Sequence, residues 1–352
     1  MTPKIATVTP SLVGRCLAVM FALWVLPTAA QAEAESSLPR GHYALPESGN
    51  MVGEVYTVET REGQTLLDIA REHNVGYEEI RNANPEVSLW APQPGTEVVI
   101  PARYILPPAR REGVVINVAE LRLYYYPDTA DNETPRVETY PIGIGREGFN
   151  TPLGVTETTM KLKDPAWYPP ESVRQEARER GDPPPEVVPP GPDNPLGQHA
   201  IMLDIPGYLI HGTNRPDGIG MRASRGCIRM MPETIEDLFS RIAVGERVNI
   251  IDMPVKVGRQ GERLYVQSFE SLEEQENGMG DLLEALSQLQ QRDAAADIPV
   301  DYARLRQALE ASSWQPVALA PQETREPEPL QWFDEVLALL PWHVQLVTRQ
   351  QG

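Results

Sequence analysis

Proline and glycine divide this chain into short segments, and this feature restricts its fold more than any other. There are 35 prolines and 26 glycines among 352 residues. Proline ends helices and is excluded from the interior of sheets, and glycine marks turns. We therefore expect short strands and helices joined by many loops, arranged in two or more domains because of the length of the chain.

The first 32 residues have the pattern of a secretory signal peptide. Lys4 and Arg15 supply positive charge, an apolar run of about 15 residues follows, and Ala-Gln-Ala at 30–32 fits a cleavage site. A membrane anchor is the alternative, but this run is shorter than the ~20 residues that span a bilayer. The sequence predicts secretion of the chain, with residues 33–53 as an unstructured leader.

Cleavage would change both the charge and the cysteine content. Loss of Lys4 and Arg15 takes the formal net charge from −19 to −21. This charge argues against nucleic acid as a partner, because phosphate binding needs clustered basic residues. Loss of Cys16 leaves Cys227 as the remaining cysteine. An unpaired thiol is open to oxidation outside the cytoplasm, so Cys227 is either a nucleophile or a small buried apolar side chain.

Residues 56–101 have the order strand, helix, helix, strand. Thr65 is placed to cap the first helix, the second helix stops at Asn84-Pro85, and a turn at Pro94-Gly95 precedes the closing strand. A generic small α/β domain is one interpretation of this order.

The same segment resembles the LysM module, which binds the glycan of peptidoglycan or chitin. The matching positions include Tyr56-Thr57-Val58, Gly63 to Leu66, Asn84-Pro85 and Ile100-Pro101, with Gln64 where Asp is usual. The resemblance implies a small βααβ glycan-binding module over residues 54–102, followed by a linker at 103–112.

Alternating apolar and polar residues predict a mainly β region over residues 113–253. Within it, residues 165–195 hold ten prolines around a short helical stretch, and we expect this insertion to form a lid or wall over a site. A solvated surface loop is the alternative. Residues 254–352 predict a hairpin and a helical extension. The apolar residues at helical spacing in this extension are Met279, Leu282, Leu283, Leu286 and Leu289, and Leu330, Phe333, Val336, Leu337 and Leu340.

The stretch IHGTNRPDGIGMRASRGCIRM, residues 210–230, carries the candidate chemistry. A cysteine acyltransferase needs a thiolate, a base that carries its proton, and N–H groups that face an oxyanion. His211 ends an apolar strand, Cys227 follows 16 residues later, and Gly226 allows a tight turn. Four arginines and one aspartate between residues 211 and 229 give a net charge of +3, which would favour the thiolate and attract a carboxylate.

A zinc site is the weaker alternative. Zinc usually has three or four protein ligands, and only His199, His211 and Cys227 lie near one another in the sequence, without a C-x-x-C or H-x-x-x-H pair. We expect no metal and no cofactor.

The cysteine stretch resembles the signature of the L,D-transpeptidase catalytic domain, also called YkuD, of the periplasmic ErfK/YbiS/YcfS/YnhG group, which often carries an N-terminal LysM module. The resemblance covers residues 54 to about 270. The supporting matches are Thr151-Pro152-Leu153-Gly154, PAWYPP at 165–170, GPDNPLG at 191–197 and PVKVGRQGERLYV at 254–266. It implies a YkuD-like β-sandwich with short helices and the lid insertion, beside the LysM module and the helical extension.

The family also implies roles for single residues. Cys227 would be the nucleophile and His211 its base, with the Gly212 carbonyl orienting the imidazole. The N–H groups of Gly226 and Cys227 would form the oxyanion hole, and Ser224 would hold the turn. The residues expected to contact substrate are Arg229, Arg225, Trp167 and Tyr208. The family commonly has His at the position of Arg225.

The implied reaction is peptidoglycan cross-linking. Cys227 would attack the third-residue carbonyl of a tetrapeptide stem, release D-Ala and pass the acyl group to an amine of a neighbouring stem or of an outer-membrane lipoprotein. A carboxypeptidase or amidase-type hydrolase of the same fold, and a wall-binding scaffold without catalysis, are the alternatives.

Overall fold

A computed structural model describes residues 38–130, 133–183, 185–270, 278–293 and 298–321. The predicted signal peptide at 1–32 and the predicted helix around residues 330–340 lie outside these ranges. Within them, no helix has the length and apolar content needed to cross a membrane.

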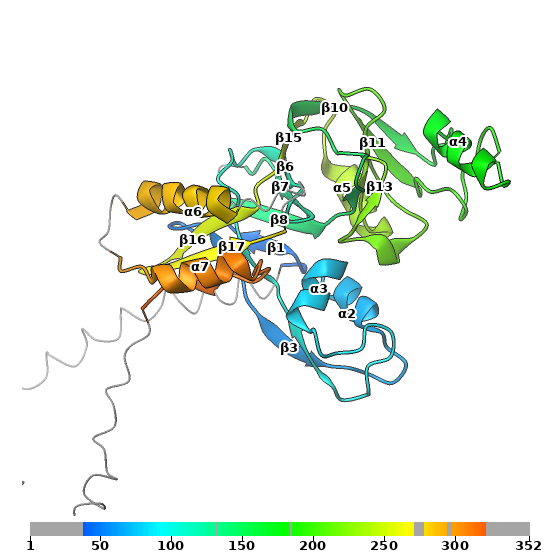
Figure 1. The fold of residues 1–352 in the computed structure, drawn as a ribbon. Helices are drawn as coiled ribbons and strands as arrows, with labels where there is room; N and C mark the ends of the chain where they lie inside the picture. The colour runs from blue at the N-terminus through cyan, green and yellow to red at the C-terminus, as the bar shows by residue number, and fades with distance from the viewer. Residues whose placement is uncertain (1–37, 131–132, 184, 271–277, 294–297, 322–352) are drawn as a thin grey trace, which may run out of the picture.

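A nine-stranded sheet forms the largest part of the structure (Figure 1). In the order in which they lie side by side, its strands are β1 (His42–Ala44), β8 (Arg136–Pro141), β7 (Arg122–Tyr126), β6 (Gly113–Asn117), β15 (Arg247–Ile251), β10 (Gly154–Lys163), β11 (His199–Leu203), β12 (Leu209–His211) and β14 (Ile228–Arg229). The pairs β6–β15 and β12–β14 are parallel, and the other neighbours are antiparallel.

Both halves of this sheet contribute to one apolar core. Ile116 and Tyr125 come from one half, Ile201 and Ile210 from the other, and Leu238 from helix α5 (Pro232–Arg241). Because residues at the two ends of the strand order share a core, the sheet must bend around it. The prediction of a mainly β catalytic region with few helices is confirmed.

A second sheet lies beside the first. Its strands are β16 (Val255–Gln260), β17 (Arg263–Ser268) and β18 (Val317–Ala318), and the first two form the predicted hairpin. Helices α6 (Gly278–Asp293) and α7 (Tyr302–Glu310) pack on this sheet through a separate apolar cluster. The spaced leucines Leu282, Leu286 and Leu289 of α6 belong to that cluster, as their periodicity indicates.

The predicted unstructured leader, residues 33–53, is wrong for its described part. Strand β1 pairs with β8 at the edge of the main sheet, and β2 (Met51–Gly53) pairs with β5 (Arg103–Ile105). The predicted linker 103–112 therefore begins with a strand. Both leader strands are three residues long, so they are too short to produce a periodic pattern, and they are held by strands distant in sequence.

Residues 54–102, the LysM-like module, have the predicted order of strand, helix, helix and strand. Strand β3 (Tyr56–Glu59) is followed by α2 (Leu66–Glu72), α3 (Tyr77–Ala83) and β4 (Glu97–Ile100). Thr65 caps α2 as expected: its hydroxyl accepts from the Asp68 N–H at 3.1 Å, and the Asp68 carboxylate accepts from the Thr65 N–H at 2.9 Å. This reciprocal pair satisfies two donors at the helix start.

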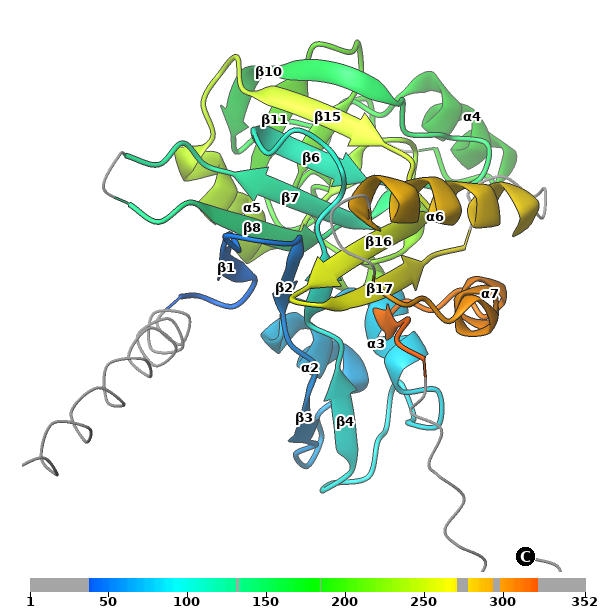
Figure 2. The ribbon, with the colours of Figure 1, turned by 90° about the vertical axis from the view of Figure 1, so that its left-hand side faces the viewer.

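The module packs directly against the main sheet (Figure 2). Leu66 and Ile80 of the module share a buried cluster with Tyr124 and Val137 of β7 and β8. At the centre of the contact, Arg122 of β7 is fully buried and forms two hydrogen bonds, of 2.9 and 2.5 Å, with the Glu79 carboxylate of α3. The two parts are thus joined by a buried ion pair.

The Arg122–Glu79 pair gives the first prediction. Glu79→Gln leaves the Arg122 charge buried without its counter-ion, and removal of one member of a buried pair typically costs about 3–5 kcal/mol. We expect a loss of that size in the free energy of unfolding measured with urea. Glu72→Gln, which breaks the exposed pair with Arg61, is the control and should cost less than about 1 kcal/mol. Equal losses in the two variants would contradict the structural role assigned to Glu79.

Candidate active site

Strands β12 and β14 bring the predicted nucleophile and base to one face. The two strands run parallel, with Ile210 opposite Ile228 and His211 opposite Arg229. His211 and Arg229 therefore lie on one face, on strands about 4.8 Å apart. Cys227 directly precedes β14, and the alternation of side chains, continued back by one residue, places it on the same face. The Arg229 charge influences the pKa of both His211 and Cys227, in agreement with this placement.

A tight turn presents Cys227 after strand β13 (Arg222–Ser224). The Ser224 hydroxyl donates to the Cys227 carbonyl at 2.6 Å and accepts from the Gly226 N–H at 3.1 Å, so Ser224 holds the turn as expected. Gly226 has φ of +104°, and a Cβ there would lie 2.7 Å from the Tyr208 ring. Only glycine fits this conformation without strain.

The Gly226 N–H is not free to face an oxyanion, as the family resemblance implies it would be. A role in the oxyanion hole needs a free donor, whereas the single proton of this N–H is already directed to the Ser224 hydroxyl. The Cys227 N–H is therefore the remaining candidate of the expected pair.

Burial keeps the Cys227 thiol neutral. The side chain is half-buried, and the thiol donates to the Gly207 carbonyl at 3.6 Å. Burial raises the pKa of this thiol, and a backbone hydrogen bond from Leu209 and the charge of Arg229 only partly offset the rise. The expectation that the arginine-rich stretch favours a resting thiolate is wrong, because desolvation outweighs the attraction.

His211 is also neutral. It is 4% exposed, and its Nδ1 lies 2.6 Å from the Gly212 carbonyl, the contact that the family resemblance implies. Burial first, and then the Arg229 charge, lower the pKa of His211 to about 4. With Nδ1 donating to Gly212, the neutral ring keeps its lone pair on Nε2. Among the described residues, no hydrogen bond joins this ring to the Cys227 thiol.

The chain matches known families in two places. A model of the L,D-transpeptidase catalytic domain (YkuD) matches residues 111–250, and a LysM domain model matches residues 56–101. The chain is 45% identical over 224 residues to the probable L,D-transpeptidase YcfS of Escherichia coli, which covers 62% of this chain and 69% of that relative.

The chain belongs to the L,D-transpeptidase family.

Other family members agree with this assignment. The probable L,D-transpeptidase ErfK/SrfK of Escherichia coli is 44% identical over 218 residues, with 61% of this chain and 69% of the relative covered. Among solved structures, the catalytic domain of the Enterococcus faecium L,D-transpeptidase is 19% identical, over 41% of this chain and all of that one, with a TM-score of 0.30. The family assignment rests on the sequence relatives, and it confirms the predicted L,D-transpeptidase with a LysM domain.

Two of the predicted substrate residues interact with the proline-rich insertion or belong to it. Arg225 forms an ion pair with Glu176 of helix α4 (Glu171–Glu179), inside the proline-rich insertion. Trp167 lies at the base of that insertion, where its backbone pairs with Val188 at 2.8 and 2.9 Å. By contrast, Tyr208 packs on Gly226 beside Cys227.

Sequence reasoning missed two residues that support the turn before Cys227. Glu176 was hidden because its partner is 49 residues away, although it lies in the helical stretch of the insertion. Thr151 donates to the Gly226 carbonyl at 2.9 Å. The sequence does contain a signal for Thr151, because Thr151-Pro152-Leu153-Gly154 matches the transpeptidase family. That match assigns no role to the Thr151 hydroxyl.

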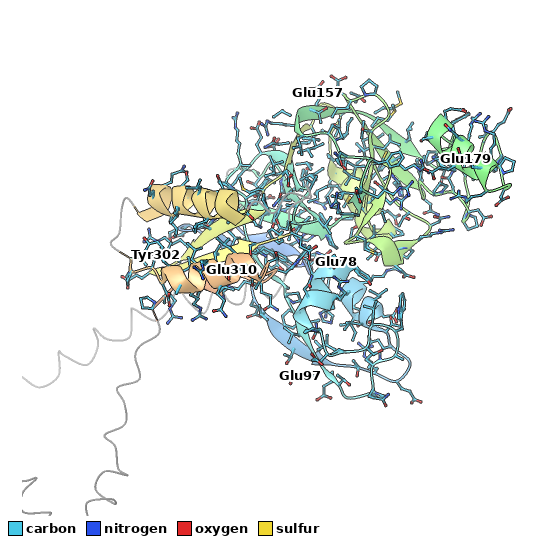
Figure 3. The ribbon with its side chains drawn as sticks, in the orientation of Figure 1. Glu78, Glu97, Glu157, Glu179, Tyr302 and Glu310 are labelled. Carbon is cyan, nitrogen blue, oxygen red and sulfur yellow. The ribbon has the colours of Figure 1, made fainter. Side chains whose placement is uncertain are left out.

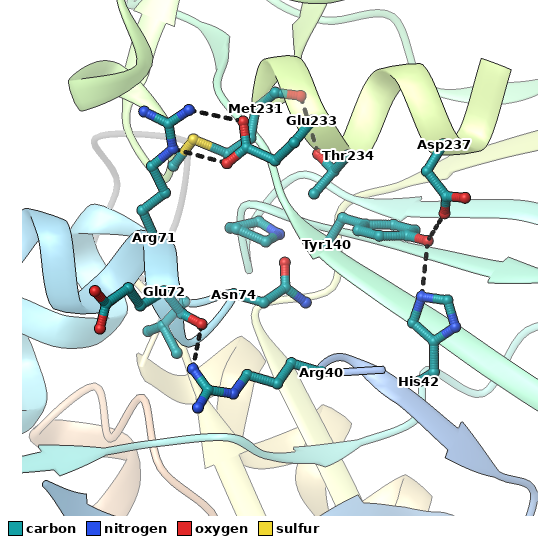
Figure 4. A pocket seen from close by; sticks show the side chains of 12 residues that line it. Arg40, His42, Arg71, Glu72, Asn74, Tyr140, Met231, Glu233, Thr234 and Asp237 are labelled. Carbon is teal, nitrogen blue, oxygen red and sulfur yellow. Dashed lines mark hydrogen bonds and ion pairs between the residues drawn. The ribbon is translucent and has the colours of Figure 1, made fainter. Parts of the chain in front are cut away.

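A cavity of about 200 Å³, which Cys227 does not line, lies between α2, β1, β8 and α5 (Figure 4). Beside it, His42, Glu138 and Asp237 come close enough to hold a metal ion. Arg241, however, already binds the Glu138 carboxylate at 2.6 and 2.7 Å and also pairs with Asp237. These charges are neutralised by arginine, so the cluster is better explained as an ion-pair network.

The raised thiol pKa gives the second prediction. Because a raised pKa leaves less thiolate at any given pH, alkylation of Cys227 by iodoacetamide should increase with pH up to values above the ~8.5 of a free thiol. The measurement is the rate–pH profile of the protein without residues 1–32, with glutathione as the reference. Arg229→Gln should move the inflection further upward, since it removes a stabilising positive charge. An inflection below that of glutathione would refute the neutral resting thiol.

Proposed function

We propose that this L,D-transpeptidase cross-links peptidoglycan through acylation of Cys227 by a tetrapeptide stem. The observation that carries the proposal is the pairing of His211 with Arg229 on adjacent parallel strands, with Cys227 directly before the second of them. A thiol, a base with a free lone pair and a fixed positive charge are the groups that acyl transfer requires.

The reaction would proceed from the neutral pair. As the Cys227 sulfur attacks the third-residue carbonyl, its proton passes to Nε2 of His211, and the developing oxyanion faces the Cys227 N–H. The C–N bond to D-Ala then breaks, and the amine leaves with the proton from His211. In the second half, the acceptor amine attacks the thioester carbonyl and His211 takes its proton. The C–S bond then breaks, and the Cys227 sulfur regains the proton from His211.

Arg229 would act on both partners of this transfer. Its charge stabilises the thiolate and lowers the pKa of His211, so the proton moves to the ring only while substrate is being attacked. The Gly212 carbonyl fixes the ring, and it favours the imidazolium as that charge appears.

The LysM module would hold the enzyme on glycan strands outside the cytoplasm. The N-terminal pattern supports export to the periplasm, and the acceptor would be a neighbouring stem or an outer-membrane lipoprotein. On the module, the Trp90 side chain is 62% exposed, in the loop between α3 and β4. An exposed indole offers a flat apolar face with a polar edge, which suits stacking on a sugar ring.

The insertion at 165–195 would act as a lid over the site. Its base is closed by the Trp167–Val188 backbone pair and by Asn194, which is fully buried and donates to the Pro165 carbonyl at 2.8 Å. With its base fixed, the segment carrying α4 stands out from the main sheet, where Glu179 marks the end of the helix (Figure 3).

Acylation gives the third prediction. Wild-type protein incubated with tetrapeptide muropeptides should yield cross-linked dimers by mass spectrometry, and Cys227→Ala should yield none. His211→Ala should slow thioester formation by ~10²-fold, the usual scale of general-base catalysis. Shortened monomers in place of dimers would indicate the hydrolase, and unchanged substrate would indicate the scaffold. Either result would overturn cross-linking.

Glycan binding gives the fourth prediction. We expect the full chain to co-sediment with purified wall sacculi, and Trp90→Ala to weaken this binding by about threefold or more, because one aromatic contact is removed. Tyr302→Ala is the matched control, since Tyr302 is 61% exposed but lies on α7, far from the module loop (Figure 3). Equal loss in the two variants would remove Trp90 from the binding surface.

A further inference from the structure

Glu176 joins the insertion to the catalytic turn. Its carboxylate accepts from Arg146 at 2.9 Å through one oxygen and pairs with Arg225 through the other. Arg225 lies two residues before Cys227, and Arg146 follows strand β9 (Ile144–Gly145), which pairs with β13. One carboxylate on α4 therefore bridges the two chain segments that flank the nucleophile.

The two arginines share a second partner. The guanidinium carbons of Arg146 and Arg225 each lie 4.9 Å from the centre of the Phe149 ring. Cation–π contacts of this kind orient a guanidinium as well as attract it. Both arginines are thus fixed by Glu176 and by Phe149.

One guanidinium nitrogen of Arg225 has no hydrogen-bond acceptor among the described residues. Within the described part of the protein, its Nη1 is buried and has no hydrogen-bond partner, while Nη2 binds Glu176. A buried donor without an acceptor is costly, so such groups are usually satisfied by a ligand or by water. A guanidinium nitrogen is best matched by a carboxylate oxygen.

We propose that Arg146, Glu176 and Arg225 form a latch that closes α4 over the Cys227 turn and presents Arg225 Nη1 to a carboxylate of the donor peptide. Glu176 is the positioning residue of this latch, and Arg225 determines donor specificity. The inference rests on the proposed transpeptidase function for the identity of the donor. Closure of α4 itself does not depend on that function.

Glu176→Gln tests the latch, because it removes the charge and keeps the shape. The first readout is hydrogen exchange of the α4 backbone amides in the full chain without substrate. Loss of the charged bridge should speed exchange of these amides by roughly threefold to tenfold, given the modest strength of partly exposed ion pairs. Glu171→Gln, which breaks the exposed pair with Arg178 on the same helix, is the control and should leave both exchange and turnover near wild type.

Turnover of the donor provides the second readout. Glu176→Gln should raise KM for a tetrapeptide donor with little change in kcat, and the salt dependence of kcat/KM should become weaker than in the wild type. Iodoacetamide, which is too small to need the lid, should alkylate Cys227 at an unchanged or higher rate.

Donors in which one carboxylate at a time is amidated test Arg225. The wild type should discriminate against one of them by about fivefold or more, since charge-assisted hydrogen bonds are roughly twice as strong as neutral ones. Arg225→Gln should lose that discrimination. Unchanged α4 exchange in Glu176→Gln would overturn the latch, and equal discrimination in Arg225→Gln would overturn the donor contact. Failure of every protein, wild type included, to use the donor would instead overturn the proposed function, while the exchange result would still decide the latch.

Discussion

The buried ion pair between Arg122 and Glu79 is the constraint on which the arrangement of the protein depends. Arg122 also donates to the Thr139 hydroxyl at 3.1 Å and to the Asn74 carbonyl at 3.2 Å, and it stacks on Tyr104. A buried guanidinium is tolerated only when its donors are satisfied. Those partners come from both sides of the contact, so the charge cannot be accommodated unless the LysM module and the sheet are together.

Glu79 connects this pair to the catalytic segment. Its carboxylate also accepts from the Gly76 N–H at 2.6 Å, at the start of α3. The next two N–H groups of that helix, from Tyr77 and Glu78, donate to the carbonyls of Ile219 and Gly220 at 3.0 and 3.3 Å. A Cβ on Gly220 would lie 2.2 Å from the Tyr77 nitrogen, so only glycine allows this approach. The loop between His211 and Cys227 is therefore supported by the LysM module, and Arg71 adds a bidentate bond to Glu233 of α5.

How much of this could be predicted from the sequence depends on the distance between interacting residues. The cap at Thr65 and the hairpin after residue 254 rest on neighbours within a few positions, and both were predicted from the residues. The turn held by Ser224 is equally local, and the family resemblance implied it. The two leader strands were missed because their hydrogen bonds go to strands 50 to 100 residues away. The partners of Arg122 and Arg225 could not be predicted for the same reason. A sequence shows that a residue is charged, but it does not show which distant residue binds it.

The protonation states of Cys227 and His211 also depend on the folded structure and could not be predicted from the sequence. Counting the arginines around Cys227 predicts a lowered thiol pKa. The count leaves out desolvation, which raises that pKa by more than the Arg229 charge lowers it. His211 is buried and Cys227 is half-buried, and desolvation raises the pKa of the thiol and lowers the pKa of the imidazole. Both shifts favour the neutral group. In the proposed reaction, the proton of the neutral thiol would move to His211 only as the substrate is attacked. The positive charge of Arg229 favours the thiolate and disfavours the imidazolium. Under the proposed mechanism, proton transfer would therefore be limited to the moment when a new bond to sulfur offsets its cost.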